Sequence, residues 1–257
     1  MFEAVIQEAS QFRKIIDSFK DLVDAVNFDC TTKNIQVQAM DGAHVALVFL
    51  NMEAGFFDKY RCDRSVSLGV NVGTIAKVMK CASSDDQMKL QAEDDGNQLM
   101  FTFQSKSNER NSKFEINLLE IDSPEALQIP ETSYSAEITF SSSEFSKLIR
   151  DMANFGDTVT IQAKKSSIQF SVGGSTGKGS IVIQETPEVE TTKITIKEAI
   201  QLTFSLKYLS QFSKGSSLGE TVTLKMSEDS PLLVEFPFGD DLGSLKFFLA
   251  PKIESDE

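Results

Sequence analysis

The residue types that most often carry out catalysis are scarce in this chain and widely separated. His44 is the only histidine, and its sequence context offers no catalytic serine or cysteine partner. Cys30, Cys62 and Cys81 stand far apart and do not have the spacing of a zinc site. Their odd number favours a reducing intracellular setting over a disulfide framework. We therefore expect neither an enzyme nor a bound cofactor.

One glycine-rich stretch, GGSTGKGS at residues 173–180, has the composition of a phosphate-binding loop. A Walker A loop requires glycine, four residues, and then Gly-Lys followed by serine or threonine. Val172 stands where the first glycine is required, and Gly179 stands where the hydroxyl is required. The stretch also joins two predicted strands rather than a strand and a helix. It is therefore interpreted as a hairpin turn.

Phosphate binding is nevertheless the chemistry that the basic residues favour. The chain carries 25 basic and 38 acidic residues, for a net charge of −13. On the four segments predicted as helices the balance reverses, with nine basic residues in or just beyond them. These residues are Arg13, Lys14, Lys20, Lys77, Lys80, Lys147, Arg150, Lys207 and Lys214. One basic helix face is usually ordinary solvation, but four such helices in an acidic chain favour contact with phosphates.

The elements that must position these side chains are amphipathic helices. A helical period of apolar residues predicts helices over 10–26, 72–81, 141–154 and 205–213. At about 100° per residue, Lys77 and Lys80 fall on the face opposite Ile75 and Val78. Most other segments alternate polar and apolar residues between turns, which predicts antiparallel hairpins and an α+β fold. The apolar runs are too short for a membrane span, and the N-terminus does not resemble a signal peptide.

Two pairs of segments repeat at nearly the same spacing. SQFRKII at 10–16 recurs as SEFSKLI at 143–149, an offset of 133 residues. The segment 67–90 aligns without gaps to 201–224, an offset of 134. The repetition predicts two similar domains, each containing two helices and their strands. We assign them to residues 1–117 and 135–257, joined by an acidic, proline-containing connector at 118–134.

Several stretches resemble one family closely, and the resemblance covers essentially the whole chain. They are FRKIIDSFKDLVD, MDGAHVALV, YRCDR, AKVMKCA, EFSKLIRDM, LQIPETSY and LKFFLAPKIESDE. These stretches resemble the eukaryotic DNA sliding clamps, the proliferating cell nuclear antigen family. The resemblance implies a nuclear homotrimeric ring, in which four helices per subunit line the hole around double-stranded DNA and the sheets form the outside. The nine basic residues, with Arg61 and Arg64, would then meet DNA phosphates without reading base sequence.

The resemblance also implies a pocket that binds short peptide motifs of partner proteins. Its expected residues are Met40, His44, Val45, Leu127, Ile129, Pro130, Pro231, Leu232, Val234, Phe248, Ala250, Pro251 and Ile253. For Met40 and Val45, an ordinary core position is the alternative. The implied partners are a replicative DNA polymerase, a clamp loader, and flap endonuclease and DNA ligase type proteins. A membrane is not among them.

Two further groups of residues come from the same resemblance. Subunit contacts would use two edge strands, with Lys113, Phe114, Ile116 and Leu118 on one and Lys178, Gly179 and Ile181 on the other. Lys165, or the adjacent Lys164, aligns with the lysine that receives ubiquitin or its relatives. The alternative function is a peptide-binding scaffold, or a checkpoint-type clamp subunit, that does not itself form a homotrimeric DNA ring.

Overall fold

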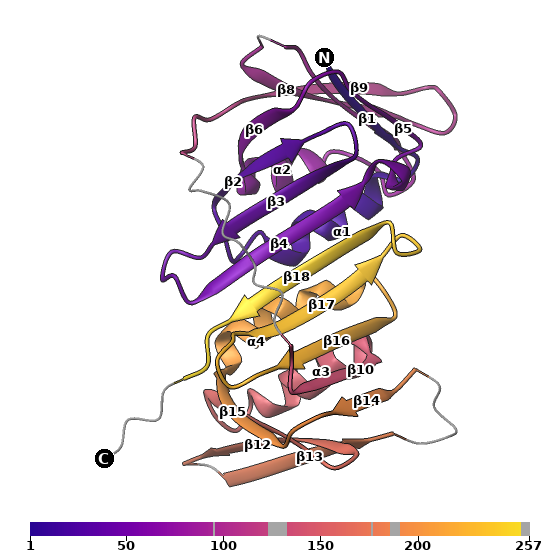
Figure 1. Cartoon of the computed structure of the whole chain (residues 1–257). Helices are drawn as coiled ribbons and strands as arrows, with labels where there is room; N and C mark the ends of the chain where they lie inside the picture. The colour runs from indigo at the N-terminus through magenta and orange to yellow at the C-terminus, as the bar shows by residue number, and fades with distance from the viewer. Residues whose placement is uncertain (95, 123–132, 176, 186–190, 253–257) are drawn as a thin grey trace. The chain divides into compact units, whose positions relative to one another are not determined.

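The chain forms two compact units in the computed structural model (Figure 1), which describes residues 1–94, 96–122, 133–175, 177–185 and 191–252. The first unit consists mainly of strands β1 to β9 with helices α1 and α2. The second consists mainly of β10 to β18 with α3 and α4. Most of the predicted connector lies outside the described residues, so its boundaries stay a prediction. The strand pairs whose register is described are antiparallel, such as β1 with β5 and β10 with β16, which agrees with the α+β class.

In the first unit, nine strands form a five-stranded order β5-β1-β7-β8-β9 and a four-stranded order β4-β3-β2-β6. Figure 1 shows α1 and α2 together behind β2, β3 and β4. The helices are α1 (Ala9–Phe19) and α2 (Val72–Met79), with a short 3-10 turn η1 (Ala54–Phe56). The strands are β1 (Phe2–Ile6), β2 (Ala25–Cys30), β3 (Asn34–Met40), β4 (Ala46–Glu53), β5 (Lys59–Cys62), β6 (Val66–Asn71), β7 (Gln87–Ala92), β8 (Gln98–Gln104) and β9 (Asn111–Asn117).

The second unit repeats this arrangement element by element. Its strand orders are β14-β10-β16-β17-β18 and β13-β12-β11-β15, which match the first unit position for position and confirm the duplication. The helices are α3 (Ser142–Met152) and α4 (Leu206–Phe212), the latter followed by the 3-10 turn η2 (Ser213–Ser217). The strands are β10 (Ala136–Ser141), β11 (Thr158–Lys164), β12 (Ser167–Gly174), β13 (Gly177–Gln184), β14 (Lys193–Ile196), β15 (Ile200–Ser205), β16 (Thr221–Met226), β17 (Leu232–Phe238) and β18 (Gly243–Leu249).

Equivalent phenylalanines anchor the first helix of each unit in its core. Phe12 of α1 and Phe145 of α3 are both completely buried. Phe12 packs edge-on against Phe28 of β2, with ring centroids 6.4 Å apart. Phe145 packs against Phe140 of β10 and Phe236 of β17, each at 6.1 Å. This packing fixes which face of each helix points away from the sheets.

The first helix is shorter than the predicted 10–26. It ends at Phe19, and the chain turns so that Val26 already lies in β2. Leu22 and Val23 are buried in the turn between them. The apolar spacing continued past the helix because buried turn residues and the first inward position of a strand happened to keep its period. The 10–26 prediction was therefore wrong at its C-terminal end.

Gly215 follows the fourth helix but does not end it in the way that a C-terminal glycine often does. Gly215 lies inside the 3-10 turn η2, and it does not have the positive φ of a helix-ending glycine. A Cβ at this position would lie 2.5 Å from the ring of Phe236. Glycine is required here because an aromatic ring packs directly against the backbone.

The two anchoring phenylalanines predict matched losses of stability. Replacing Phe12 or Phe145 by alanine should lower the free energy of unfolding by about 3–5 kcal/mol, because each change leaves a cavity in a closed core. Urea unfolding followed by circular dichroism measures this. The control is Phe155→Ala, because Phe155 is 44% exposed and should cost less than about 1 kcal/mol. A loss as small as the control's at Phe12 or Phe145 would contradict the packing described.

Candidate nucleic-acid interface

The second helix of the first unit has a clean division between its buried and basic faces. Ile75 and Met79 are completely buried, whereas Lys77 and Lys80 are exposed. The ammonium group of neither lysine makes a hydrogen bond or ion pair with another described residue. Asn71 caps the helix by accepting the N–H of Thr74 at 2.8 Å. The two ammonium groups are therefore held on a short, capped helix and remain available to an anion.

The third helix shows the same division. Lys147 and Arg150 are exposed, while Leu148 and Ile149 between them are buried. The charged groups of Lys147 and Arg150 make no hydrogen bond or ion pair within the described parts of the chain. Ser141 caps the helix, because its hydroxyl accepts the N–H of Glu144 at 3.4 Å. Lys14 on α1 and Lys207 on α4 are likewise exposed.

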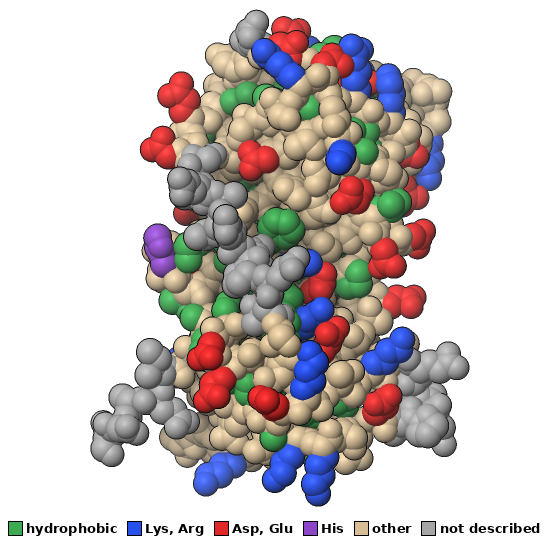
Figure 2. All heavy atoms as spheres, in the orientation of Figure 1, with side chains coloured by type: hydrophobic (Ala, Val, Ile, Leu, Met, Phe, Trp, Pro, Cys, Tyr) green, Lys and Arg blue, Asp and Glu red, His purple; other side chains and the backbone are tan. Residues whose placement is uncertain are grey.

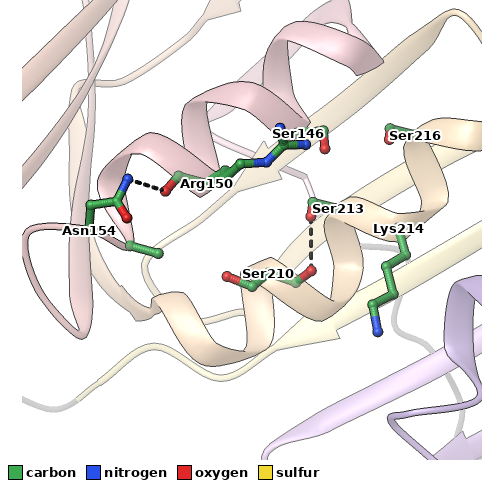
Figure 3. A pocket seen from close by; sticks show the side chains of 8 residues that line it. Ser146, Arg150, Asn154, Ser210, Ser213, Lys214 and Ser216 are labelled. Carbon is green, nitrogen blue, oxygen red and sulfur yellow. Dashed lines mark hydrogen bonds between the residues drawn. The ribbon is translucent and has the colours of Figure 1, made fainter.

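A groove of about 440 Å³ lies between α3 and the α4–η2 segment, within the second unit. Figure 3 shows Arg150 lying along α3 toward Ser146, whereas the Lys214 side chain extends away from the other labelled residues. Serine hydroxyls and an amide supply most of its polar lining. The lining residues are Ser146, Arg150, Ala153, Asn154, Ser210, Ser213, Lys214 and Ser216. Sequence reasoning missed these serines, because serine alone carries no functional signal.

Helix α1 does not present its cations as predicted. The Arg13 guanidinium donates from Nη2 to the carbonyl oxygens of Met79, at 2.6 Å, and of Ala82. Lys20 is paired with Asp17 on the same helix, with Nζ 2.6 Å from Oδ1. The structure therefore corrects the assignment of Arg13, whose guanidinium ties α1 to the C-terminal end of α2. It also leaves Lys20 partly neutralised.

Arg61 and Arg64 lie in a cluster of mixed charge. Arg61 contacts Asp63 through Nε at 2.8 Å, and Arg64 contacts Asp94 at 3.3 Å. The N-terminal ammonium of Met1 contacts both carboxylates. The hydrogen bond from Arg61 lowers the pKa of Asp63, and that from the N-terminal ammonium lowers the pKa of Asp94. Because these carboxylates offset the positive charge, the two arginines offer less to a phosphate than Lys77 and Lys80.

Part of the predicted peptide pocket lies at the surface. Met40 is 39% exposed, and His44, Pro231 and Ala250 are also exposed. Val45 and Pro251 are half-buried. Met40 is thus not the core residue that the alternative interpretation allowed. Leu127, Ile129, Pro130 and Ile253 lie outside the described residues.

Three other residues of the predicted pocket have little or no surface to offer. Leu232 and Val234 on β17 are completely buried, and Phe248 on β18 is 6% exposed. Leu232 and Val234 share one side of β17 with Phe236, which is completely buried. The prediction that Leu232 and Val234 contact a partner is therefore wrong for the chain as folded here.

The two strands predicted to join subunits are both at sheet edges. Among the described strands, β9 pairs only with β8, and β13 pairs only with β12. Phe114, Leu118 and Ile181 are half-buried, and Ile116 is buried. The charged members are exposed, with Lys113 paired to Glu115 at 2.8 Å and Lys178 on the other strand. The sequence did not single out Val182, which is 49% exposed on β13.

The lysines predicted as modification sites lie at the tip of the β11–β12 hairpin. Lys164 pairs with Ser167, which leaves Lys165 and Ser166 as the two turn residues. Lys165 has a φ of 58°, and both lysines are exposed. Both side chains are accessible to a modifying enzyme, and their exposure does not distinguish Lys164 from Lys165.

The described residues contain no cluster of three or more histidine, cysteine or acidic side chains placed to hold a metal ion. Nor does that part of the chain include a helix long and apolar enough to cross a membrane.

Figure 2 shows acidic and basic side chains interspersed over the face turned away from the helices. The concentration of unpaired cations on α2 and α3 is thus a local feature.

A duplicated α+β unit, with basic helix faces turned away from its sheets, defines a protein of the DNA-clamp class. The family models for the N-terminal and C-terminal domains of proliferating cell nuclear antigen match residues 1–126 and 128–252. The proliferating cell nuclear antigen of Dictyostelium discoideum is 45% identical over 260 residues, covering 99% of this chain and all of the relative. That of Chaetomium thermophilum is 42% identical over 261 residues, covering both chains completely.

The chain therefore belongs to the proliferating cell nuclear antigen family. Its role is that of a DNA sliding clamp, a processivity factor in DNA replication and repair.

The contrast between Arg13 and Lys80 gives a paired prediction. Arg13→Gln should lower the free energy of unfolding by about 1–3 kcal/mol, because two carbonyls lose a charged donor. Lys80→Gln should leave stability unchanged and reduce by about one the slope of log affinity for duplex DNA against log salt. Thermal unfolding and fluorescence anisotropy with a labelled duplex measure the two effects. If Arg13→Gln reduced the salt slope as much as Lys80→Gln, the internal role of Arg13 would be refuted.

Proposed function

We propose that three copies of this chain close into a ring around duplex DNA, and that the ring tethers replication and repair proteins. The observation that carries the proposal is that the same chain has two strand edges without a neighbour, at β9 and β13, and helices with exposed basic faces. Free edges at β9 and β13 allow head-to-tail assembly, and the helices supply cations for the enclosed DNA. The ring carries out no reaction of its own and needs no cofactor.

The two edges have the features of an assembly joint. An unpaired edge presents backbone donors and acceptors that another strand can satisfy. Because β9 and β13 are different strands, their contact would be heterologous, and such contacts form rings when the rotation closes. A Cβ at Gly179 of β13 would meet only Val172, at an ordinary 3.6 Å. Glycine is not required there by the chain's own packing, which suits close approach of a second copy.

Phosphate contacts through exposed lysines and arginines suit a protein that moves along DNA. Such contacts are electrostatic, fall with salt and do not depend on base sequence. Lys77, Lys80, Lys147 and Arg150 extend from helices whose opposite faces are fixed in the cores. A rigid array of this kind neutralises the backbone without entering a groove to read bases.

Partner proteins would dock through short peptides that contact Met40, His44, Pro231 and Ala250, each of which is exposed. An exposed apolar site with a polar surround is typical of motif recognition. The partners are a replicative polymerase, a clamp loader, and flap endonuclease and DNA ligase type proteins, and the compartment is the nucleus. Lys165, or Lys164, is the position for ubiquitin-type modification. A scaffold or checkpoint-type subunit without a homotrimeric ring is the alternative.

Light scattering distinguishes the ring from the scaffold. The wild-type chain should have the mass of a trimer, and Gly179→Val should shift the population toward monomer without lowering stability. The reason is that valine fits within one chain but obstructs an approaching strand. Gly173→Ala, on the neighbouring strand β12, is the control, because the nearest atom to its Cβ is 3.7 Å away. A wild-type chain that stays monomeric at all concentrations would refute the homotrimer.

Charge reversal tests the DNA-facing helices. Lys80→Glu with Arg150→Glu should weaken polymerase stimulation by loaded rings at least tenfold while leaving the trimer intact, because two attractive contacts per subunit become repulsive. The measurement is primer extension on a singly primed circular template with loader present. Retention on circular compared with linearised DNA serves as the control for topology. Unchanged stimulation by an intact trimer would remove these helices from the DNA-binding surface.

A further inference from the structure

The two repeats differ at the place where their helices meet. Counting by the repeat offsets, Ser146 on α3 is the counterpart of Arg13 on α1. Ser213 and Ser216 are the counterparts of Met79 and Ala82, whose carbonyls receive the Arg13 guanidinium. In the first unit an internal cation fills this position. In the second unit the side chain is only a hydroxymethyl group, and the groove of about 440 Å³ occupies the same position.

The charge one helical turn further along is also reversed. Asp17 on α1 is the counterpart of Arg150 on α3. Asp17 is neutralised by Lys20 at 2.6 Å, whereas the Arg150 guanidinium makes no bond with any described residue. The first unit therefore has a filled, internally balanced site. The second has an open groove with a cation at its rim.

The polar groups lining this groove match the requirements of a phosphate. The hydroxyls of Ser146, Ser210 and Ser216 make no hydrogen bond with other described residues, so each can donate one. Ser213 is different, because its hydroxyl already donates to the Ser210 carbonyl at 2.9 Å (Figure 3). A guanidinium beside several hydroxyl donors is a strong combination for a phosphate oxygen. The groove lacks any carboxylate in its lining.

We propose that the α3–α4 groove seats one backbone phosphate of the DNA, and that the corresponding position of the first unit, filled by Arg13, does not. The inference rests on the proposed function and refines it. The first unit contributes surface contacts through Lys77 and Lys80, whereas the second also holds a phosphate between two helices. Arg13 acts as a positioning residue that joins α1 to α2 and keeps the equivalent hollow closed.

The variant Ser146→Arg distinguishes two explanations of DNA binding: a phosphate held in the groove, and attraction by a diffuse positive surface. It places in the second unit the side chain that closes the first, and it adds one positive charge. If cations act only as a diffuse field, affinity for duplex DNA should rise. If the groove seats a phosphate, affinity should instead fall by about three- to tenfold, because the new guanidinium occupies the groove and binds the Ser213 and Ser216 carbonyls.

Asp151→Asn is the matched control, because it changes the charge of α3 by the same amount at an exposed residue outside the groove. It should strengthen binding slightly. Arg150→Gln, a second variant that keeps the groove open, should reduce the salt slope by about one. Anisotropy with a fluorescein-labelled linear duplex across a salt series measures all four proteins, with thermal unfolding as a check on folding. Affinity that rises in Ser146→Arg as it does in Asp151→Asn would overturn the proposal.

Two further experiments are needed. One distinguishes DNA phosphate from free inorganic phosphate as the ligand, and the other distinguishes failure of the phosphate seat from failure of the proposed clamp function. Inorganic phosphate should shift the backbone amide resonances of residues 146 and 210 in the wild type, and it should not shift those of the same two positions in Ser146→Arg. The absence of a shift in the wild type with both phosphate and duplex would refute the seat. A shift with inorganic phosphate alone would refute the assignment to DNA. Retention of loaded wild-type rings on circular DNA tests the clamp itself, so failure there is distinguishable from failure of the seat.

Discussion

Each helix in this chain is held by one apolar stripe that must be buried against a sheet, and the position of the cations depends on it. Phe12 and Phe145 fix the rotation of α1 and α3 because their rings are enclosed in the cores. Once the rotation is fixed, residues three or four positions from a buried one share its side, and positions off that stripe, such as Lys147 and Arg150, point to solvent. The basic face is thus a consequence of burial, and no specific contact is needed to orient it.

Both repeats bury an apolar helix stripe against a sheet, whereas the residues that point outward differ between the repeats. The strand orders of the two units match at every position, and the helices keep the same lengths or nearly so. Outside the buried stripe, however, Arg13 is replaced by Ser146, and Asp17 by Arg150. Selection on packing therefore explains what is common to the repeats. The differences lie at positions that packing leaves open, and those positions are where the two units differ in charge.

The sequence was sufficient for the features that depend on periodicity. Hairpins, four helices and the duplication all leave a pattern along the chain, and the structure contains them. The edge strands came from the family resemblance instead. Features that depend on distant neighbours were not predictable. The end of α1, the ring of Phe236 against Gly215 and the burial of Leu232 and Val234 depend on which side of an element meets another. The Arg13 bonds are of the same kind, since no local signal marks a guanidinium that binds carbonyls 66 and 69 residues away.

A clamp must hold DNA for long periods without fixing it at one position, and the balance between acids and bases serves that requirement. If every basic side chain bound a DNA phosphate with a free energy of several kilocalories per mole, the ring could not slide. Pairing Lys20 with Asp17, and Arg61 and Arg64 with Asp63 and Asp94, removes part of the attraction at those sites. In the proposed ring, the unpaired cations of α2 and α3 would then supply most of the contact. Retention follows from topology, so the electrostatic contacts need only centre the duplex, and their strength can remain low.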